Sequence, residues 1–259
     1  MIPKKIHYWG LGGNIIPLEA KVLISTWKKK MPDYEIKCWT EKNFDVQSVK
    51  WVRQAIENKK WAFAADYIRL YALYHEGGIY MDTDVEVFKP FDEFLKYSFF
   101  SSVEYHKEFE TEGKPRLGDD FLPKIKGDTI PNMGILSALM ACEPGNAYIK
   151  QCLDFYDNQS FVRENGSLYT DIIIPDFLAR EAIPYGFRYK DETQYLKDNM
   201  VVFDSSVFAG DYICQTPDSY ALHYCYGTWR DRFFQAKVRR WYYLKKWALK
   251  KIIKKWLSP

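Results

Sequence analysis

Residues Ala64 to Pro90 read AADYIRLYALYHEGGIYMDTDVEVFKP, and this stretch indicates the fold of the chain more clearly than any other. Helical periodicity runs from Trp61 to His75 and should stop at Gly77, because glycine commonly follows the last turn of a helix. The next four residues, Gly78 to Met81, are short and apolar, as in a strand buried on both faces. The stretch therefore predicts a helix followed directly by a buried strand.

The same alternation of strand and helix surrounds this stretch. Strand patterns cover residues 5–9, 34–39, 85–88 and 200–208, and helical patterns cover 18–30, 49–58 and 169–182. Such alternation predicts an α/β fold, a mixed and mainly parallel sheet flanked by helices. Ligands of such sheets bind beyond the carboxyl ends of the strands.

The middle of the chain is less regular. Residues 104–129 are rich in charge, glycine and proline, so we expect a surface loop there. A helical pattern returns from Asn132 to Tyr156. We expect one domain over residues 1–228 and a separate tail over 229–259.

Asp82 and Asp84 follow the buried strand, two residues apart. Side chains at positions i and i+2 of a strand point the same way, so both carboxylates should face the ligand crevice. Hard oxygen ligands suit Mg²⁺ or Mn²⁺, which complete their coordination with water and substrate phosphates. The pair suggests a divalent metal that holds a phosphate, and taken without its context it is also compatible with two solvated aspartates on a surface strand.

Composition is that of a folded globular protein, with 47% hydrophobic and 27% charged residues among 259. No apolar run is long enough to span a bilayer. The opening residues lack an apolar segment and cleavage site of a secretory signal, so we expect a cytoplasmic protein. Five widely spaced cysteines indicate reduced thiols and neither a disulfide framework nor a zinc site.

The tail is strongly basic. Residues 229–259 hold eleven Lys or Arg and one acid, a charge of +10; the whole chain carries +3, which leaves −7 for residues 1–228. An amphipathic helix is predicted there, with an apolar face and a lysine-rich face. Three interpretations stay open: binding to an anionic membrane surface, docking on the domain, and, least favoured, binding to nucleic acid.

The run from Ala64 to Pro90 resembles the core of sugar-nucleotide glycosyltransferases with the GT-A fold and a DXD motif. It is most similar to the family that contains yeast initiating mannosyltransferases and bacterial capsule and O-antigen enzymes, and distantly to clostridial toxin glucosyltransferase domains. IPKKIHYW near the start and ALHYCYGTW near the end extend the resemblance.

The resemblance implies roles for individual residues. Asp82 and Asp84 would be the catalytic DXD pair, and Asp84, Asp82 and His223 would hold Mn²⁺ or Mg²⁺. The implied substrate-binding residues are Trp9, Asp66, Arg69, Tyr80, Asp82, Asn132, Gly227, Thr228 and Trp229. The alternative for Asp66 and Arg69 is an i, i+3 ion pair on a helix surface, and for His223 and Trp229 it is packing in the core.

Trp9 departs from the family pattern. Relatives carry an aromatic residue three positions after the histidine of the first strand, where it stacks on the nucleotide base. Counting from His7, that position is Gly10 here, so Trp9 arrives one residue early. A slip of one residue turns a strand side chain to the opposite face.

The expected activity is metal-dependent, retaining transfer of a hexose from a nucleotide-diphosphate sugar to a hydroxyl of a glycan or a polyprenyl-linked oligosaccharide in bacterial polysaccharide synthesis. UDP-hexose is the favoured donor and GDP-mannose the second. Four acids, Asp119, Asp120, Asp171 and Asp176, stay open as residues that orient the acceptor. The expected location is the inner face of the cell membrane, reached through the tail. The rival hypotheses are a metal-dependent phosphate-cleaving hydrolase and a non-catalytic membrane-binding protein.

Overall fold

The computed structural model describes residues 1–10 and 16–225. Residues Met1–Tyr224 form one compact unit. The predicted boundary at residue 228, the tail beyond it, and Gly227, Thr228 and Trp229 lie outside the described residues.

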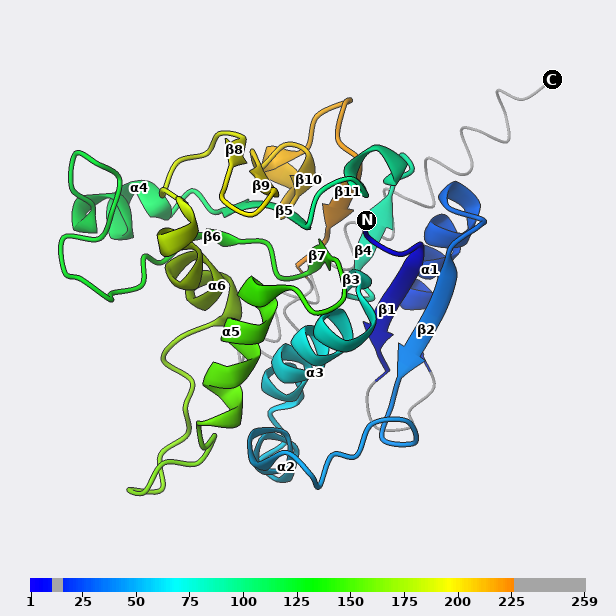
Figure 1. Ribbon diagram of the computed structural model, residues 1–259, viewed down its shortest axis with the longest axis horizontal. Coiled ribbons are helices and arrows are strands. Elements are labelled where there is room, and N and C mark those ends of the chain that lie inside the picture. Colours follow the sequence, from blue (N-terminus) through cyan, green and yellow to red (C-terminus); the bar gives the residue numbers. More distant parts are fainter. Residues whose placement is uncertain (11–15, 226–259) are drawn as a thin grey trace. The chain divides into compact units, whose positions relative to one another are not determined.

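A mixed sheet with helices on both faces forms the body of the domain (Figure 1). Its strands follow the order β2-β1-β3-β7-β5-β9-β8, with β6 paired to β5 at one side, and a smaller sheet has the order β10-β11-β4. The strands are β1 (Lys5–Trp9), β2 (Glu35–Trp39), β3 (Gly78–Met81), β4 (Val85–Val87), β5 (Phe99–Tyr105), β6 (Met133–Ile135), β7 (Leu139–Cys142), β8 (Gln194–Tyr195), β9 (Met200–Phe203), β10 (Phe208–Ala209) and β11 (Ala221–His223).

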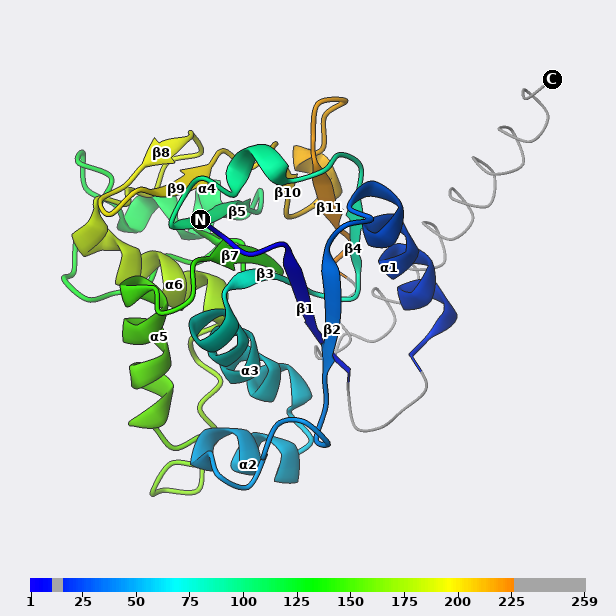
Figure 2. The same cartoon turned by 45° about the vertical axis from the view of Figure 1, so that its right-hand side comes forward.

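The helices are α1 (Leu18–Lys30), α2 (Lys50–Glu57), α3 (Trp61–Glu76), α4 (Phe109–Glu112), α5 (Ala147–Asp157) and α6 (Ile174–Ala182). One hydrophobic core joins α2, α3, α5 and α6 to one face of the sheet, and a second core lies on the other face with α1. Figures 1 and 2 show α1 on the far side of β1 and β2 from α3. The predicted α/β class is confirmed.

Parallel pairing joins β1 to β2 and to β3, and joins β5 to β9. Strand β7 runs antiparallel between β3 and β5. Strands β3 and β5 therefore point the same way, and their carboxyl ends lie at one edge of the sheet.

The turn from α3 into β3 depends on two glycines. Gly77 caps α3 with φ of +63°, and Gly78 begins β3 with φ of +96°. A Cβ atom on Gly78 would lie 2.5 Å from the carbonyl oxygen of Lys5 on β1. Only glycine combines this backbone conformation with such a close approach. The pair thus sets β3 directly against β1.

The helical prediction for residues 132–156 is wrong in its first half. Strands β6 and β7 occupy Met133–Ile135 and Leu139–Cys142, and helix α5 begins only at Ala147. All seven strand residues are buried. Short apolar runs buried on both faces lose the alternation that marks a strand, so periodicity does not distinguish them from helix. The predicted loop over residues 104–129 contains the single turn α4.

Candidate functional site

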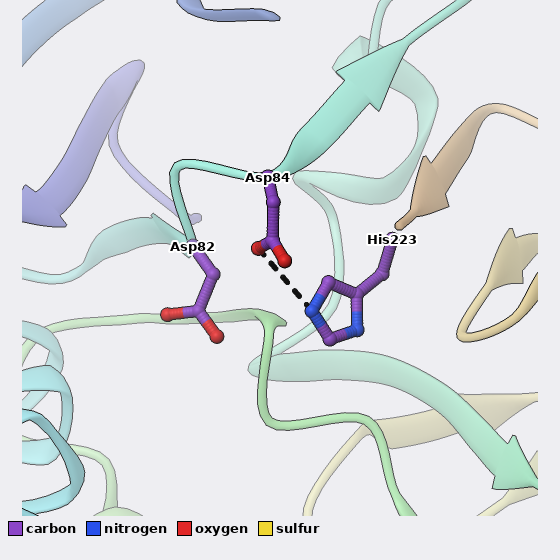
Figure 3. A group of neighbouring side chains, drawn as sticks. All are labelled: Asp82, Asp84 and His223. Carbon is purple, nitrogen blue, oxygen red and sulfur yellow. Dashed lines mark ion pairs between the residues drawn. The ribbon is translucent and has the colours of Figure 1, made fainter. Parts of the chain in front are cut away.

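Two carboxylates and one imidazole converge at the sheet edge where β3 ends. Asp82 follows β3, Asp84 precedes β4, and His223 ends β11, as Figure 3 shows. One ligand atom from each of the three lies within 4.8 Å of the others. Nε2 of His223 is 3.3 Å from Oδ1 of Asp84. The structure thus brings together the three residues expected to hold a metal.

Backbone pairing fixes this arrangement. Strand β11 runs antiparallel to β4 with His223 opposite Val85, and the Tyr224 N–H donates to the carbonyl of Asp84 over 3.0 Å. Helix α1 supports β4 from outside, because the indole N–H of Trp27 donates to the carbonyl of Val85 over 2.8 Å. Asp84 and His223 therefore lie at the adjacent ends of two paired, anchored strands.

Asp82 is held from the opposite side by α3. The guanidinium of Arg69 lies 3.6 Å from Oδ1 of Asp82 and 3.2 Å from Oδ1 of Asp66. The side chains of Arg69 and Asp66 are only 5% and 9% exposed, so they are not a surface ion pair. Arg69 also donates to the carbonyl of Ser137 over 2.7 Å and stacks on Tyr80, 4.9 Å from its ring centre.

The buried pair has unusual protonation behaviour. Burial raises the pKa of the Asp66 carboxyl to about 7, although the charge of Arg69 opposes the shift. Burial also disfavours the charge of Arg69, but Asp82, Tyr80 and Asp66 outweigh it and raise its pKa. Tyr80 is buried, which raises its pKa well above the ordinary value. Arg69 is therefore a permanent cation behind the DXD pair.

The donor set fits a hard divalent cation. Two carboxylates supply hard oxygen ligands, and one imidazole adds a nitrogen that Mn²⁺ accepts more readily than Mg²⁺. All three side chains are half-buried, which leaves positions for water or phosphate oxygens. The site can hold a metal and an anionic ligand together.

Residues 17–100 match the sequence family described as the glycosyltransferase sugar-binding region containing the DXD motif. This part of the chain is therefore similar to the DXD region of glycosyltransferases. The match covers α1 through the start of β5 and includes Asp66, Arg69, Asp82 and Asp84. It confirms the resemblance seen between Ala64 and Pro90.

Two curated proteins are similar to parts of the chain. Glucan organizing enzyme 1 of Cryptococcus neoformans is 29% identical over 99 residues, which are 38% of this chain and 23% of that protein. Subversion of eukaryotic traffic protein A of Legionella pneumophila is 23% identical over 193 residues, 63% of this chain and 26% of that protein. The chain spans about a quarter of the length of these relatives.

Two solved structures are similar to the chain. The PaToxG glycosyltransferase has a TM-score of 0.48 and 18% identity, covering 71% of this chain and 69% of that one. A glycosyltransferase involved in glycosylating the major capsid of PBCV-1 has a TM-score of 0.45 and 12% identity, covering 91% and 98%.

Asn132 and Trp9, also expected to bind substrate, are not part of the group formed by Asp82, Asp84 and His223. The side-chain amide of Asn132 donates to Glu112 over 2.8 Å, and no contact within the described residues joins it to Asp82, Asp84 or His223. Trp9 is buried at the end of β1, in the core that α3 covers. Their roles toward substrate stay predictions.

Sequence reasoning missed the contribution of the segment between β6 and β7. The carbonyl of Ser137 accepts from Arg69, and the carbonyl of Ala138 accepts from the backbone N–H of Asp82 over 2.9 Å. These backbone groups hold both ends of the Arg69–Asp82 pair. A helical reading of residues 132–156 hid them, since helical carbonyls bond within the helix.

Proposed function

We propose that this protein is a metal-dependent, retaining glycosyltransferase that moves a hexose from a nucleotide-diphosphate sugar to an acceptor hydroxyl. The observation that carries the proposal is the convergence of Asp82, Asp84 and His223 in front of the buried Arg69–Asp66 pair. UDP-hexose is the favoured donor, with GDP-mannose second, because of the resemblance to bacterial capsule enzymes.

Asp82, Asp84 and His223 would hold Mn²⁺ in preference to Mg²⁺, because the imidazole nitrogen suits the softer ion. A bound divalent cation neutralises the diphosphate leaving group. Arg69 keeps Asp82 in place through an ion pair and the carbonyl of Ser137, so the carboxylate needs no reorganisation when a ligand arrives. Retention by front-face attack needs no dedicated base, since the departing phosphate accepts the proton of the acceptor hydroxyl.

The acceptor in this proposal is a glycan or a polyprenyl-linked oligosaccharide of bacterial surface polysaccharide synthesis. The basic tail supports it, because eleven Lys or Arg over residues 229–259 favour an anionic membrane surface next to such an acceptor. No helix within the described residues is long and apolar enough to cross a membrane. The tail would then hold a cytoplasmic enzyme at the inner face of the membrane.

Asp84→Asn tests the metal site. We expect Mn²⁺ and UDP-glucose together to raise the melting temperature of the wild-type protein by mass action. The substitution removes one metal ligand, so the Mn²⁺-dependent affinity for UDP-glucose should fall by more than about 100-fold, beyond the effect usual for outer-shell residues. Asp218→Asn is the matched control, since that carboxylate is 99% exposed.

Donor turnover separates the rival functions. A transferase should discriminate among UDP-glucose, UDP-galactose and GDP-mannose and should turn over faster when an acceptor glycan is added. Equal cleavage of all three donors without any acceptor would instead identify a hydrolase. Absence of any nucleotide-sugar binding, with vesicle binding retained in Asp84→Asn, would identify a non-catalytic membrane protein.

A further inference from the structure

The outer edge of β4 is bonded by side chains of a helix, where a larger sheet would offer a strand. Among the described residues β4 pairs with β11 alone, and the carbonyl of Asp84 faces that strand. Because alternate residues of a strand bond on opposite sides, the backbone groups of Val85 and Val87 face away from β11. There the indole N–H of Trp27 donates to the carbonyl of Val85 over 2.8 Å, and the N–H of Val87 donates to the hydroxyl of Thr26 over 3.0 Å. One donor and one acceptor of α1 thus replace a neighbouring strand.

The two side chains of α1 are themselves held in place. The hydroxyl of Thr26 donates its hydrogen to the carbonyl of Leu23 over 2.6 Å, so toward Val87 its oxygen can only accept. Trp27 is fully buried, and its ring lies edge-on to Tyr8 of β1 with 5.9 Å between the ring centres. Neither side chain can turn away from β4 without losing a second contact.

Val85 connects this edge to the metal-binding residues. It follows Asp84 directly, its N–H donates to the carbonyl of Asp82 over 3.1 Å, and its carbonyl accepts from Trp27. Its side chain is buried in the core that lies under α1. Both backbone groups of the residue after Asp84 are therefore fixed, one by the turn from Asp82 and the other by α1.

We propose that Thr26 and Trp27 are positioning residues for the metal site, so that α1 sets the affinity of this site for a divalent cation. The inference rests on the proposed function, because it requires that Asp82, Asp84 and His223 hold the metal. Neither Thr26 nor Trp27 touches the ion. Both act through β4, which fixes where the carboxylate of Asp84 lies.

Removal of groups that orient metal ligands from outside the coordination sphere lowers metal affinity by about 10- to 100-fold. Without the hydroxyl of Thr26, the N–H of Val87 loses its acceptor beside a buried core, and β4 gains free energy by shifting toward water or another acceptor. Such a shift moves Asp84 but not Asp82, whose N–H is held by the carbonyl of Ala138. The ligand atoms would then converge less well.

Thr26→Val and Ser25→Ala form a matched pair of variants for the test. Both hydroxyls donate to the carbonyl three residues earlier on α1, but only the hydroxyl of Thr26 also accepts from β4. We expect Thr26→Val to weaken Mn²⁺ binding about tenfold, measured by electron paramagnetic resonance of the free ion, and Ser25→Ala to leave it unchanged. Thr26→Ser keeps the oxygen atom and should keep the wild-type affinity.

Trp27→Phe and Trp51→Phe separate positioning from stability. Each removes a buried indole N–H that donates to a backbone carbonyl over 2.8 Å. Both variants should therefore lower the free energy of unfolding in urea by similar amounts. Only Trp27→Phe should also weaken Mn²⁺ binding about tenfold, because Trp51 bonds to Phe63 on α3 and not to β4.

Hydrogen exchange of the backbone gives a second readout that does not depend on activity. Coupling between two sites is reciprocal, so a cation whose binding needs α1 must also stabilise the contact of α1 with β4. Mn²⁺ should therefore slow exchange in the peptide that covers residues 82–90 of the wild-type protein, and should slow it less in Thr26→Val.

Wild-type Mn²⁺ affinity in both Thr26→Val and Trp27→Phe would overturn the inference, and so would an equal loss of affinity in Ser25→Ala. In either case, Mn²⁺-dependent binding of UDP-glucose by the wild-type protein would leave the proposed function standing. Failure of the wild-type protein to bind Mn²⁺ would instead overturn the metal-dependent function itself, and this inference with it.

Discussion

Besides Asp66, Asp176 is a second aspartate whose pKa is raised, and it lies apart from Asp82, Asp84 and His223. It lies in the first turn of α6, and its burial, together with the charge of Glu104, raises its pKa to about 7. His106 and Arg116 oppose the shift, and the buried Tyr189 also lies within its electrostatic reach. The carboxyl group is therefore partly protonated near neutral pH.

Asp176→Asn should change how stability depends on pH. The folded protein binds a proton at Asp176 below about pH 7, whereas the unfolded chain binds it only below about pH 4. The free energy of unfolding of the wild type therefore falls as pH rises from 4 to 7. Between pH 5 and pH 8 the variant should gain about 2 kcal/mol relative to wild type, measured by urea unfolding.

Asp171→Asn is the control for this measurement, because that carboxylate is exposed and paired with Arg163. A constant difference between Asp176→Asn and wild type across this pH range would contradict the shift. Glu104 also contacts His106, with 3.2 Å between Oε1 and Nε2. Of the four acids left open for the acceptor, Asp176 feels the charge of Glu104 on β5.

The junction of α3 and β3 fixes where Arg69 on α3 and Asp82 just after β3 lie. A Cβ on Gly78 would lie 2.5 Å from the carbonyl oxygen of Lys5, so only glycine lets β3 start this close to β1. That contact sets the spacing of β1 and β3, and hence of Trp9 and Asp82. Arg69, on the helix before the junction, reaches Asp82 just after it.

Gly78→Ala should destabilise the protein by about 3 kcal/mol or more, because a non-glycine residue at φ of +96° is strained and its Cβ meets backbone. Gly145→Ala separates the two effects, since φ is +73° there but nothing lies within 4 Å of the added Cβ. That variant should lose about 1 kcal/mol. Equal losses for the two variants in urea unfolding would refute the packing argument.

Element prediction succeeded where the pattern was long or marked by glycine. Helix α3 and strand β3 follow from periodicity and the Gly77–Gly78 stop. Strands β6 and β7 did not, because their seven buried residues show no alternation. The carbonyls of Ser137 and Ala138 lie between those strands and accept from Arg69 and from the backbone of Asp82. The wrong helix prediction therefore also missed these two hydrogen bonds.

At the scale of the whole molecule, charge is divided between an acidic body and a basic tail. Residues 229–259 carry +10 and residues 1–228 carry −7, out of a total of +3. An acidic body is repelled by anionic lipid, so membrane binding would depend on the tail alone. Salt should weaken binding to such a membrane by screening the charges of the tail and the lipid.

Deletion of residues 237–259 should abolish sedimentation with vesicles that contain anionic lipid, while the full chain sediments with them at low salt. The deletion keeps Gly227, Thr228 and Trp229, so Mn²⁺-dependent binding of UDP-glucose should persist and serves as the control. Sedimentation equal to that of the full chain would contradict the role of the tail.

The sequence by itself determined the α/β class, the α3–β3 unit and the Asp82–Asp84 pair, because spacing within one element decides which side chains share a face. Only the tertiary structure decided that His223 meets Asp84, that Arg69 is buried against Asp82, and that Trp9 shares the α3 face. Each of these depends on how strands pair with one another or on how α3 packs on the sheet. Local periodicity carries no information about these arrangements, because strand register is set by packing across the whole sheet.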